Sequence, residues 1–524
     1  MTFSRPNRSE ATLTRNRTPK SISPFSGMCA TCSVECPGLC EIAKSSYRGK
    51  EVLYPQPFGA VTAASEKDYP IDYSHFNIMG GAVGAKGIEA DSDKAIFPNV
   101  STETKIGNID LDVPIVIAGM GSTNVAADNW AGMATGAAIT GIGIVIGENV
   151  VGMDPNSEIK DGRVVKAPNL ERRIKDFQNW SEGKGFIALQ ANVEDTRLGV
   201  QEWAIENCGI ETVEIKWGQG AKDIGGEVKL NSLERALQLK SRGYVVLPDP
   251  EDPQVQEAYK NGAFKEFERH SRIGMVEEES FHSRVEELRG AGAKNVFLKT
   301  GAYRPADLAR AFKFASDAKL DMLTIDGAGG GTGMSPWRMM NEWGVPMVEL
   351  HCLAYQYASK LKAKGRHVPA VVFAGGFTLE DHMYKALALG APFVKAVGMS
   401  RAFVTASFVG HNIGKALKDD KFGKLPKAYS TYGETMDQIF ITAAELKKRF
   451  GSDFDKLPTS AIGVYTYVER LKQGLKQFMC GGRQFGLEYI TRDDIAALTR
   501  DAAEISGINY MMDVDKEEAE KILG

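Results

Sequence analysis

Eight short runs of buried-strand character, separated by segments of helical character, constrain the fold of this chain more than any other feature. Such runs, rich in β-branched residues, are typical of parallel strands buried on both faces. They lie at Pro114–Ala118, Gly141–Ile146, Gly185–Leu189, Thr212–Ile215, Asn295–Leu298, Asp321–Ile325, Ala370–Ala374 and Pro392–Val397. Helical patterns fall between them at Asp128–Ala138, Ser232–Arg242, Phe281–Arg289, Pro305–Ala318 and Asp381–Leu389.

Eight strands alternating with helices over about 300 residues is the count of a (β/α)8 TIM barrel. An open doubly wound sheet has the same local pattern, so the count favours the barrel without excluding the open sheet. A ninth run, Tyr244–Pro248, falls in the long fourth-to-fifth connection and is interpreted as an insertion. We predict an α/β protein with an N-terminal leader and cysteine-rich segment (1–105), a barrel (106–415) and a C-terminal helical extension (416–524).

The residues that follow the eight runs indicate a functional site. Barrel enzymes place their chemistry at the carboxyl ends of the strands. Each of these residues alone is explained as a turn glycine or a helix cap, but the set predicts one site. The strand ends carry Gly119, Met120, Gly147, Glu148, Gln190, Lys216, Lys299, Asp326, Gly375, Gly376, Gly398 and Arg401.

The last two strand ends, at 374–378 and 397–401, predict a phosphate site. Glycines let backbone N–H groups approach a phosphate, and the helix that follows adds a positive dipole. Barrels use the loops after strands seven and eight for this purpose, and flavin mononucleotide (FMN) would lay its ring across the mouth. Lys299 suits negative charge on a reduced flavin, and the Gln190 amide suits hydrogen bonding to the ring. The alternative is two tight turns and solvated polar side chains.

Composition excludes several classes of protein. The 524 residues are 43% apolar and 25% charged, which is typical of globular proteins rather than disordered ones. The net charge of −4 gives no basic excess for nucleic acid or an anionic membrane. The polar, basic N-terminus lacks the apolar segment of a secretory signal, so we expect a cytoplasmic protein.

Four cysteines near the N-terminus predict a metal centre. Cys29, Cys32, Cys36 and Cys40 have the spacing C-x2-C-x3-C-x3-C. Four thiolates this close suit an iron–sulfur cluster, of the 4Fe-4S kind, or a structural zinc. Disulfides are less favoured in a cytosolic enzyme.

Two longer strings carry a resemblance to a known family. They read EIKWGQGAK at 214–222, followed by Gly225–Gly226, and IDGAGGGTGMSP at 325–336. Both resemble the FMN-binding domain of glutamate synthases, where the strings read roughly EIKMAQGAKPGEGG and ISGHDGGTGASP. The resemblance covers about residues 100–415. One departure is that 400–415 contains no cysteine where the family has a trio for a three-iron cluster.

The resemblance implies a function and a set of site residues. In that family reduced FMN delivers a hydride to 2-iminoglutarate, which forms from 2-oxoglutarate and ammonia. Lys216, Gln219 and Lys222 would then bind the oxo-acid, with Lys299 beside the flavin and Glu148 at the substrate mouth. The cofactor side would include Asp326, Gly330 and Gly331.

The resemblance also implies partners. Electrons would come from ferredoxin or a reductase subunit. Because Met1–Thr2 does not offer the N-terminal cysteine nucleophile of a fused glutaminase, ammonia would come from a separate glutaminase subunit or from solution. We expect a homo-oligomer, with the C-terminal helices packed on the barrel or in a subunit interface.

Two alternatives stay open at this point. The chain could reduce another oxo- or imino-acid, or serve as a flavin and iron–sulfur electron-transfer subunit. A non-catalytic scaffold that retains the fold is the third possibility, and bound flavin would distinguish it from the other two.

Overall fold

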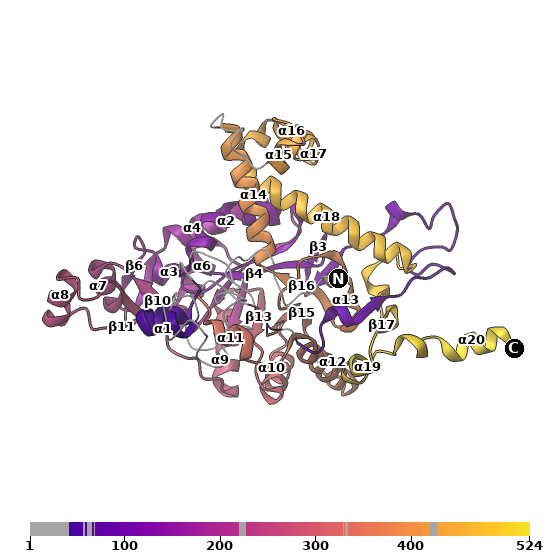
Figure 1. Cartoon of the computed structure of the whole chain (residues 1–524), viewed down its shortest axis with the longest axis horizontal. Helices are drawn as coiled ribbons and strands as arrows, with labels where there is room; N and C mark the ends of the chain where they lie inside the picture. The colour runs from indigo at the N-terminus through magenta and orange to yellow at the C-terminus, as the bar shows by residue number, and fades with distance from the viewer. Residues whose placement is uncertain are drawn as a thin grey trace, which may run out of the picture.

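The computed structural model of the chain describes residues 41–55, 58–59, 65, 67, 69–218, 227–328, 330, 334–418 and 427–524. Eight parallel strands close into a barrel in chain order (Figure 1), which confirms the TIM barrel and excludes an open sheet. Each of the eight predicted runs contains part of a strand. The strands are β4 (Ile115–Met120), β5 (Gly143–Ile146), β8 (Phe186–Ala191), β9 (Thr212–Lys216), β13 (Asn295–Thr300), β14 (Met322–Asp326), β15 (Ala370–Ala374) and β16 (Val394–Met399).

A helix follows each strand and covers the outside of the barrel. These helices are α2 (Asn124–Thr140), α4 (Pro168–Gln178), α6 (Val200–Cys208), α9 (Glu278–Gly290), α10 (Pro305–Asp317), α12 (Met347–Ala363), α13 (Glu380–Leu389) and α14 (Arg401–Lys418). Local sequence fixes their ends: the Thr123 side chain accepts the Ala126 N–H at the start of α2, and Gly141 ends that helix with a φ of 62°.

Side chains fill the barrel and its amino-terminal end. The strands β2 (Thr104–Ile106) and β3 (Ile109–Leu111) form a hairpin. Its Ile106 and Leu111 pack with the inward-facing Val116, Phe297 and Val372 of the barrel strands. Because this end is packed, a ligand site is expected only at the opposite end, where the strands finish.

The long connection between β9 and α9 forms a separate three-stranded sheet. It contains β10 (Glu227–Leu230), α7 (Leu233–Ser241), β11 (Val245–Leu247), α8 (Pro253–Lys260) and β12 (Phe267–His270), and β12 is the central strand. The ninth predicted run is therefore β11 in an insertion, as the sequence indicated. We call this unit the inserted sheet.

The first described segment, α1 (Glu41–Arg48) and the turn that follows it, is attached to the inserted sheet. The Lys50 ammonium pairs with Glu268 on β12, and the Tyr54 hydroxyl donates to Glu227 on β10. Figure 1 shows α1 beside β10 and β11 at one side of the barrel.

Part of the C-terminal extension packs on the barrel, whereas α20 (Lys516–Leu523) extends away from it (Figure 1). The long helix α18 (Thr459–Gly481) lies across α2 and α14 (Figure 1). A methyl group at Gly136 of α2 would lie 2.4 Å from Val464 of α18, so the two helices are in close contact. The strand β17 (Ile495–Ala497) pairs with β1 (Phe76–Ile78), which joins the two ends of the chain. No helix among the described residues is long and apolar enough to cross a membrane.

Candidate functional site

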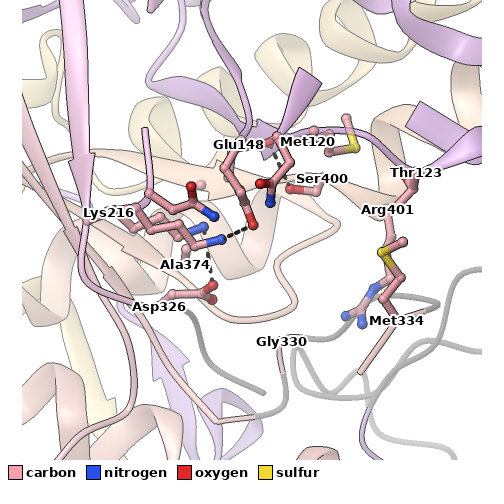
Figure 2. Close-up of a pocket in the computed structure, with 18 of the residues that line it drawn as sticks. Met120, Thr123, Glu148, Lys216, Asp326, Gly330, Met334, Ala374, Ser400 and Arg401 are labelled. Atoms are coloured by element: carbon pink, nitrogen blue, oxygen red, sulfur yellow. Dashed lines mark hydrogen bonds and ion pairs between the residues drawn. The ribbon is translucent and has the colours of Figure 1, made fainter. Parts of the chain in front are cut away.

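One cavity opens at the carboxyl ends of the barrel strands. Residues at or just after all eight strands line it, together with residues from the inserted sheet. Figure 2 shows some of the residues that follow strands, among them Glu148, Asp326 and Ser400. Of the predicted site residues, those on its wall are Gly119, Met120, Glu148, Lys216, Lys299, Asp326, Gly330, Gly375, Gly376, Gly398 and Arg401. The fold therefore brings together side chains that lie up to about 280 residues apart in sequence.

The part of the wall after β15 and β16 is built from glycine loops and helix N-termini. Gly375 and Gly376 have φ values of 140° and 105°, a region that L side chains rarely adopt. A methyl group at Gly375 would lie 2.8 Å from the Met347 sulfur. The helices α13 and α14 begin just after these loops, and the first N–H groups of a helix have no partner within it. This side suits an anion such as phosphate.

The part of the wall after β5, β9, β13 and β14 carries two pairs of opposite charges. Lys216 Nζ lies 2.5 Å from Glu148 Oε1, and Lys299 Nζ lies 3.4 Å from Asp326 Oδ2. Lys299 and Lys216 are register partners on adjacent parallel strands, so their side chains leave the same face of the sheet. Figure 2 shows Glu148 and Lys216 pointing toward each other, with Arg401 on the other side of the view.

The surroundings change the side-chain pKa values of Lys299 and Arg401 in opposite directions. Burial lowers the pKa of Lys299, but the nearby Asp326, Glu214 and Glu148 outweigh that effect, and the net change is upward. Lys299 therefore stays charged at neutral pH. Burial lowers the pKa of Arg401 to about 10, which still leaves the guanidinium protonated.

Gln190 lies beneath the cavity wall and not on it. Its amide nitrogen donates to Glu214 on β9, and its carbonyl oxygen has no hydrogen-bond partner within the described chain. Burial raises the pKa of Glu214, while Lys299 and the bond from Gln190 oppose that rise. A methyl group at Gly119 would lie 3.0 Å from the Gln190 amide. The absence of a side chain at Gly119 therefore lets the cavity wall lie close to Gln190.

Several predicted site residues fall outside the described residues. They are Gln219, Lys222, Gly331 and the four cysteines Cys29, Cys32, Cys36 and Cys40. Their roles stay predictions.

Sequence reasoning missed the contribution of the inserted sheet. Val228 of β10 and Arg269 of β12 line the cavity, as do Arg272 and Ile273 just after β12. The Arg272 guanidinium is held by Glu194, with an Nη1 to Oε2 distance of 3.0 Å. The sequence gives one signal for these residues, which is that they lie within or just after a predicted insertion that follows a strand end.

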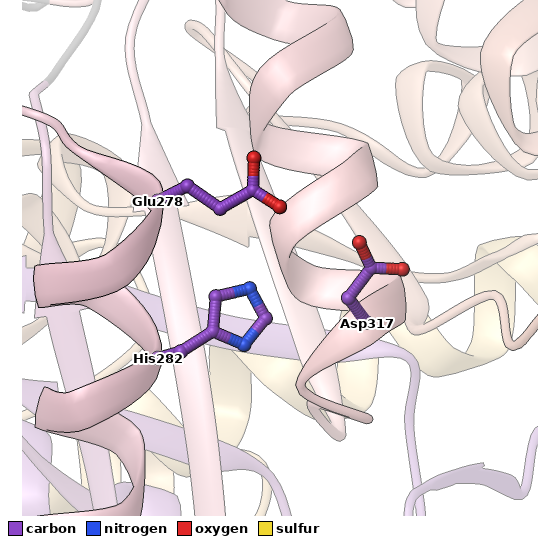
Figure 3. Close-up of side chains that lie close together, drawn as sticks. All are labelled: Glu278, His282 and Asp317. Carbon is purple, nitrogen blue, oxygen red and sulfur yellow. The ribbon is translucent and has the colours of Figure 1, made fainter.

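A second group of metal-ligand types lies away from the cavity. Glu278 and His282 on α9 face Asp317 on α10 (Figure 3), and their ligand atoms lie within 4.8 Å of one another. Lys313 already pairs with both carboxylates, and Arg366 also pairs with Asp317. We interpret this group as a surface ion-pair cluster.

Comparison with known proteins shows that part of this barrel is similar to glutamate synthases. Residues 269–406 match the domain family described as the conserved region in glutamate synthase. A glutamate synthase large subunit-like protein, YerD, of Bacillus subtilis is 34% identical over 134 residues, which cover 23% of this chain and 24% of that protein. An archaeal-type glutamate synthase (NADPH) of Thermotoga neapolitana is 25% identical over 316 residues, covering 60% and 52%.

The matches do not span the whole of these relatives. The chain covers between about a quarter and about a half of their length. Among solved structures, a mutant flavocytochrome b2 with pyruvate bound has a TM-score of 0.47 and 14% identity, over 82% of this chain and 78% of that chain. Residues 269–406 of this barrel are therefore related to the conserved region of glutamate synthases.

Proposed function

We propose that this protein is an FMN-dependent oxidoreductase of the glutamate synthase type. It would convert 2-oxoglutarate and ammonia to L-glutamate. The observation that carries the proposal is the division of one cavity into a glycine-lined side and a side with two buried lysines. The relationship to glutamate synthases supports the choice of reaction.

The described residues fit FMN. The loops at 375–378 and 398–401 can donate backbone N–H groups to its phosphate, because no side chain occupies Gly375, Gly376 or Gly398. Lys299 is held charged inside the cavity and would stabilise negative charge near the ring. Bound FMN supplies hydride transfer, and the residues of this chain bind and orient the reactants around it.

Lys216 is the residue that we assign to a substrate carboxylate. Its side chain is only 10% exposed, and a desolvated ammonium binds an anion more strongly than one in water. In this structure the Glu148 carboxylate forms an ion pair with Lys216, so an anionic substrate must compete with Glu148 for the ammonium group. Gln219 and Lys222 would complete the carboxylate site, as the resemblance implies.

The cysteine segment would supply electrons from a neighbouring position. Cys40 directly precedes α1, and the turn after α1 is attached to the inserted sheet by Lys50 and Tyr54. That sheet contributes Arg269 to the cavity wall. An iron–sulfur cluster at Cys29, Cys32, Cys36 and Cys40 would pass electrons to the flavin, and its own donor would be ferredoxin or a reductase subunit.

A second candidate is reduction of another oxo- or imino-acid. Both described lysines in the cavity already face a carboxylate, so each substrate carboxylate that binds a lysine must displace an internal partner. A monocarboxylic substrate needs one such contact.

Anaerobic mixing of the reduced holoprotein with substrate distinguishes these candidates. We expect 2-oxoglutarate plus ammonium to reoxidise the reduced flavin in a single turnover. The rate of reoxidation by pyruvate plus ammonium should be at least about tenfold lower. The reverse preference would support the second candidate. A protein that takes up no FMN would refute both.

A further inference from the structure

The turn that carries Glu148 is held in an unfavourable conformation. Asn149, the next residue, has a φ of 65°, which is uncommon for a residue with a side chain. A methyl group at Gly121 would lie 2.0 Å from the Glu148 carbonyl oxygen, so the turn also contacts the end of β4. Strained residues persist only where the surrounding structure holds them, and they cluster at functional sites.

Two buried charged side chains hold this turn from different elements. Asp195, on α5 (Val193–Leu198), accepts the Asn149 main-chain N–H at 2.8 Å. Arg269, on β12, donates to the Asn149 side-chain oxygen at 3.3 Å. Asp195 and Arg269 are 2% and 1% exposed, so water cannot replace either contact readily.

Neither charged group is fully satisfied by its surroundings. Within the described chain, Asp195 Oδ1 and Arg269 Nε have no hydrogen-bond partner. The Arg269 guanidinium lies over the Tyr244 ring at 4.7 Å, and it forms no ion pair within the described residues. Burying an acid and a cation without full hydrogen bonding costs free energy. The contacts with the turn are the interactions that account for the burial of Asp195 and Arg269.

A second contact fixes the distance between the two elements. Arg272, three residues after Arg269, binds Glu194, the neighbour of Asp195, through both its guanidinium and its main-chain N–H. These two hydrogen bonds therefore connect the end of β12 directly to the start of α5. Asn149 is held between them.

We infer that Asp195 and Arg269 are positioning residues for Glu148, and that by holding its turn they set how strongly Glu148 competes with an anionic substrate for Lys216. This inference deepens the proposed function and rests on it for the identity of the substrate. Neither residue needs to touch the substrate. Loosening the turn should weaken the Glu148–Lys216 pair and leave Lys216 more available.

Hydrogen exchange tests the positioning without requiring activity. In Asp195→Ala the Asn149 amide loses its acceptor, and we expect its exchange to accelerate at least about tenfold. Asp195→Asn keeps an acceptor oxygen and should stay within about threefold of the parent protein. The control is Asp494→Ala, because Asp494 is a buried carboxylate that accepts the Thr491 N–H far from the cavity. Unchanged exchange in Asp195→Ala, or equal acceleration in the control, overturns the inference.

Binding of glutarate, a dicarboxylate that cannot be reductively aminated, tests the competition. By calorimetry on the FMN-loaded protein, we expect Asp195→Ala to bind glutarate about threefold to tenfold more tightly. In a Glu148→Gln background the same substitution should change nothing, because it acts through Glu148. An equal effect in that background overturns the inference. If the parent protein binds FMN but not glutarate, the proposed substrate is wrong, and the exchange measurement still decides the positioning.

Discussion

The two sides of the cavity offer an anion different kinds of contact. After β15 and β16, the wall is glycine backbone at the start of two helices, with Arg401 at its edge. After β5, β9, β13 and β14, the wall carries lysines that already face carboxylates. The first side presents fixed dipoles that need no rearrangement. The second presents charges that a ligand gains only by displacing an internal partner.

This difference predicts opposite sensitivities. The glycine side depends on shape, so an added side chain should affect it far more than a change of pH. The charged side depends on ionisation and pairing, so charge-removing substitutions should affect it while leaving the cofactor bound.

The largest effect is expected from Gly375→Ala. The new methyl group would meet the Met347 sulfur, and the φ of 140° is unfavourable for alanine. We expect FMN affinity to fall by about a hundredfold or more, measured by fluorescence titration of the apoprotein. Gly365→Ala is the matched control, since Gly365 has a φ of 65° with no atom nearby. It should cost about 1 kcal/mol of stability and leave FMN binding unchanged.

Lys216→Ala should affect the substrate and not the cofactor. Loss of a charge-assisted contact costs about 1.5–3 kcal/mol, so we expect the KM for the oxo-acid to rise about tenfold to a hundredfold. FMN content and the visible spectrum should stay normal. Lys166→Ala, which breaks an exposed pair with Glu158, is the control and should change neither quantity. Loss of FMN from Lys216→Ala would mean that the two sides are not separate.

Lys299→Met should change the redox properties of the flavin. Lys299 is 4% exposed and remains charged, so its removal destabilises the anionic reduced ring. We expect the two-electron midpoint potential to fall by about 30–60 mV, measured by dye equilibration. An unchanged potential together with a raised KM would place Lys299 on the substrate instead.

The last prediction concerns pH and the carboxylate behind the charged side. Burial is the main cause that raises the pKa of Asp195 to about 7, and the negative charge of Glu148 adds to the rise. The folded protein then retains a proton that the unfolded chain releases near pH 4. The contribution of Asp195 to the free energy of unfolding should therefore fall between about pH 4 and 7, by at most about 1.4 kcal/mol per pH unit. Urea titrations of Asp195→Asn should show a shallower fall, and an identical slope would show that Asp195 is ionised throughout.

Most of the barrel could be predicted because its strands are buried on both faces. The run Ala370–Ala374 is β15 residue for residue. The sequence of the C-terminal extension has a helical pattern over Thr491–Ile505, but Ile495–Ala497 within it pairs with Phe76–Ile78 as a strand. That strand depends on a partner more than 400 residues away, which no local pattern reveals.

The candidate site could be predicted as far as it follows the strand ends. Lys216, Lys299 and Gly375 each lie at or directly after a strand, so topology alone brings them together. Asp195 and Arg269 could not be found in this way. Asp195 follows a helix cap, and Arg269 belongs to an insertion whose position over the mouth depends on tertiary contacts.

A crystal structure of the protein with FMN and 2-oxoglutarate would show both sides of the cavity occupied at once. We predict the phosphate against the main chain at 375–378 and 398–401, and a substrate carboxylate on Lys216 with Glu148 displaced. A phosphate bound at Lys216, or an oxo-acid bound while the Glu148–Lys216 pair stays intact, would contradict the division of the cavity.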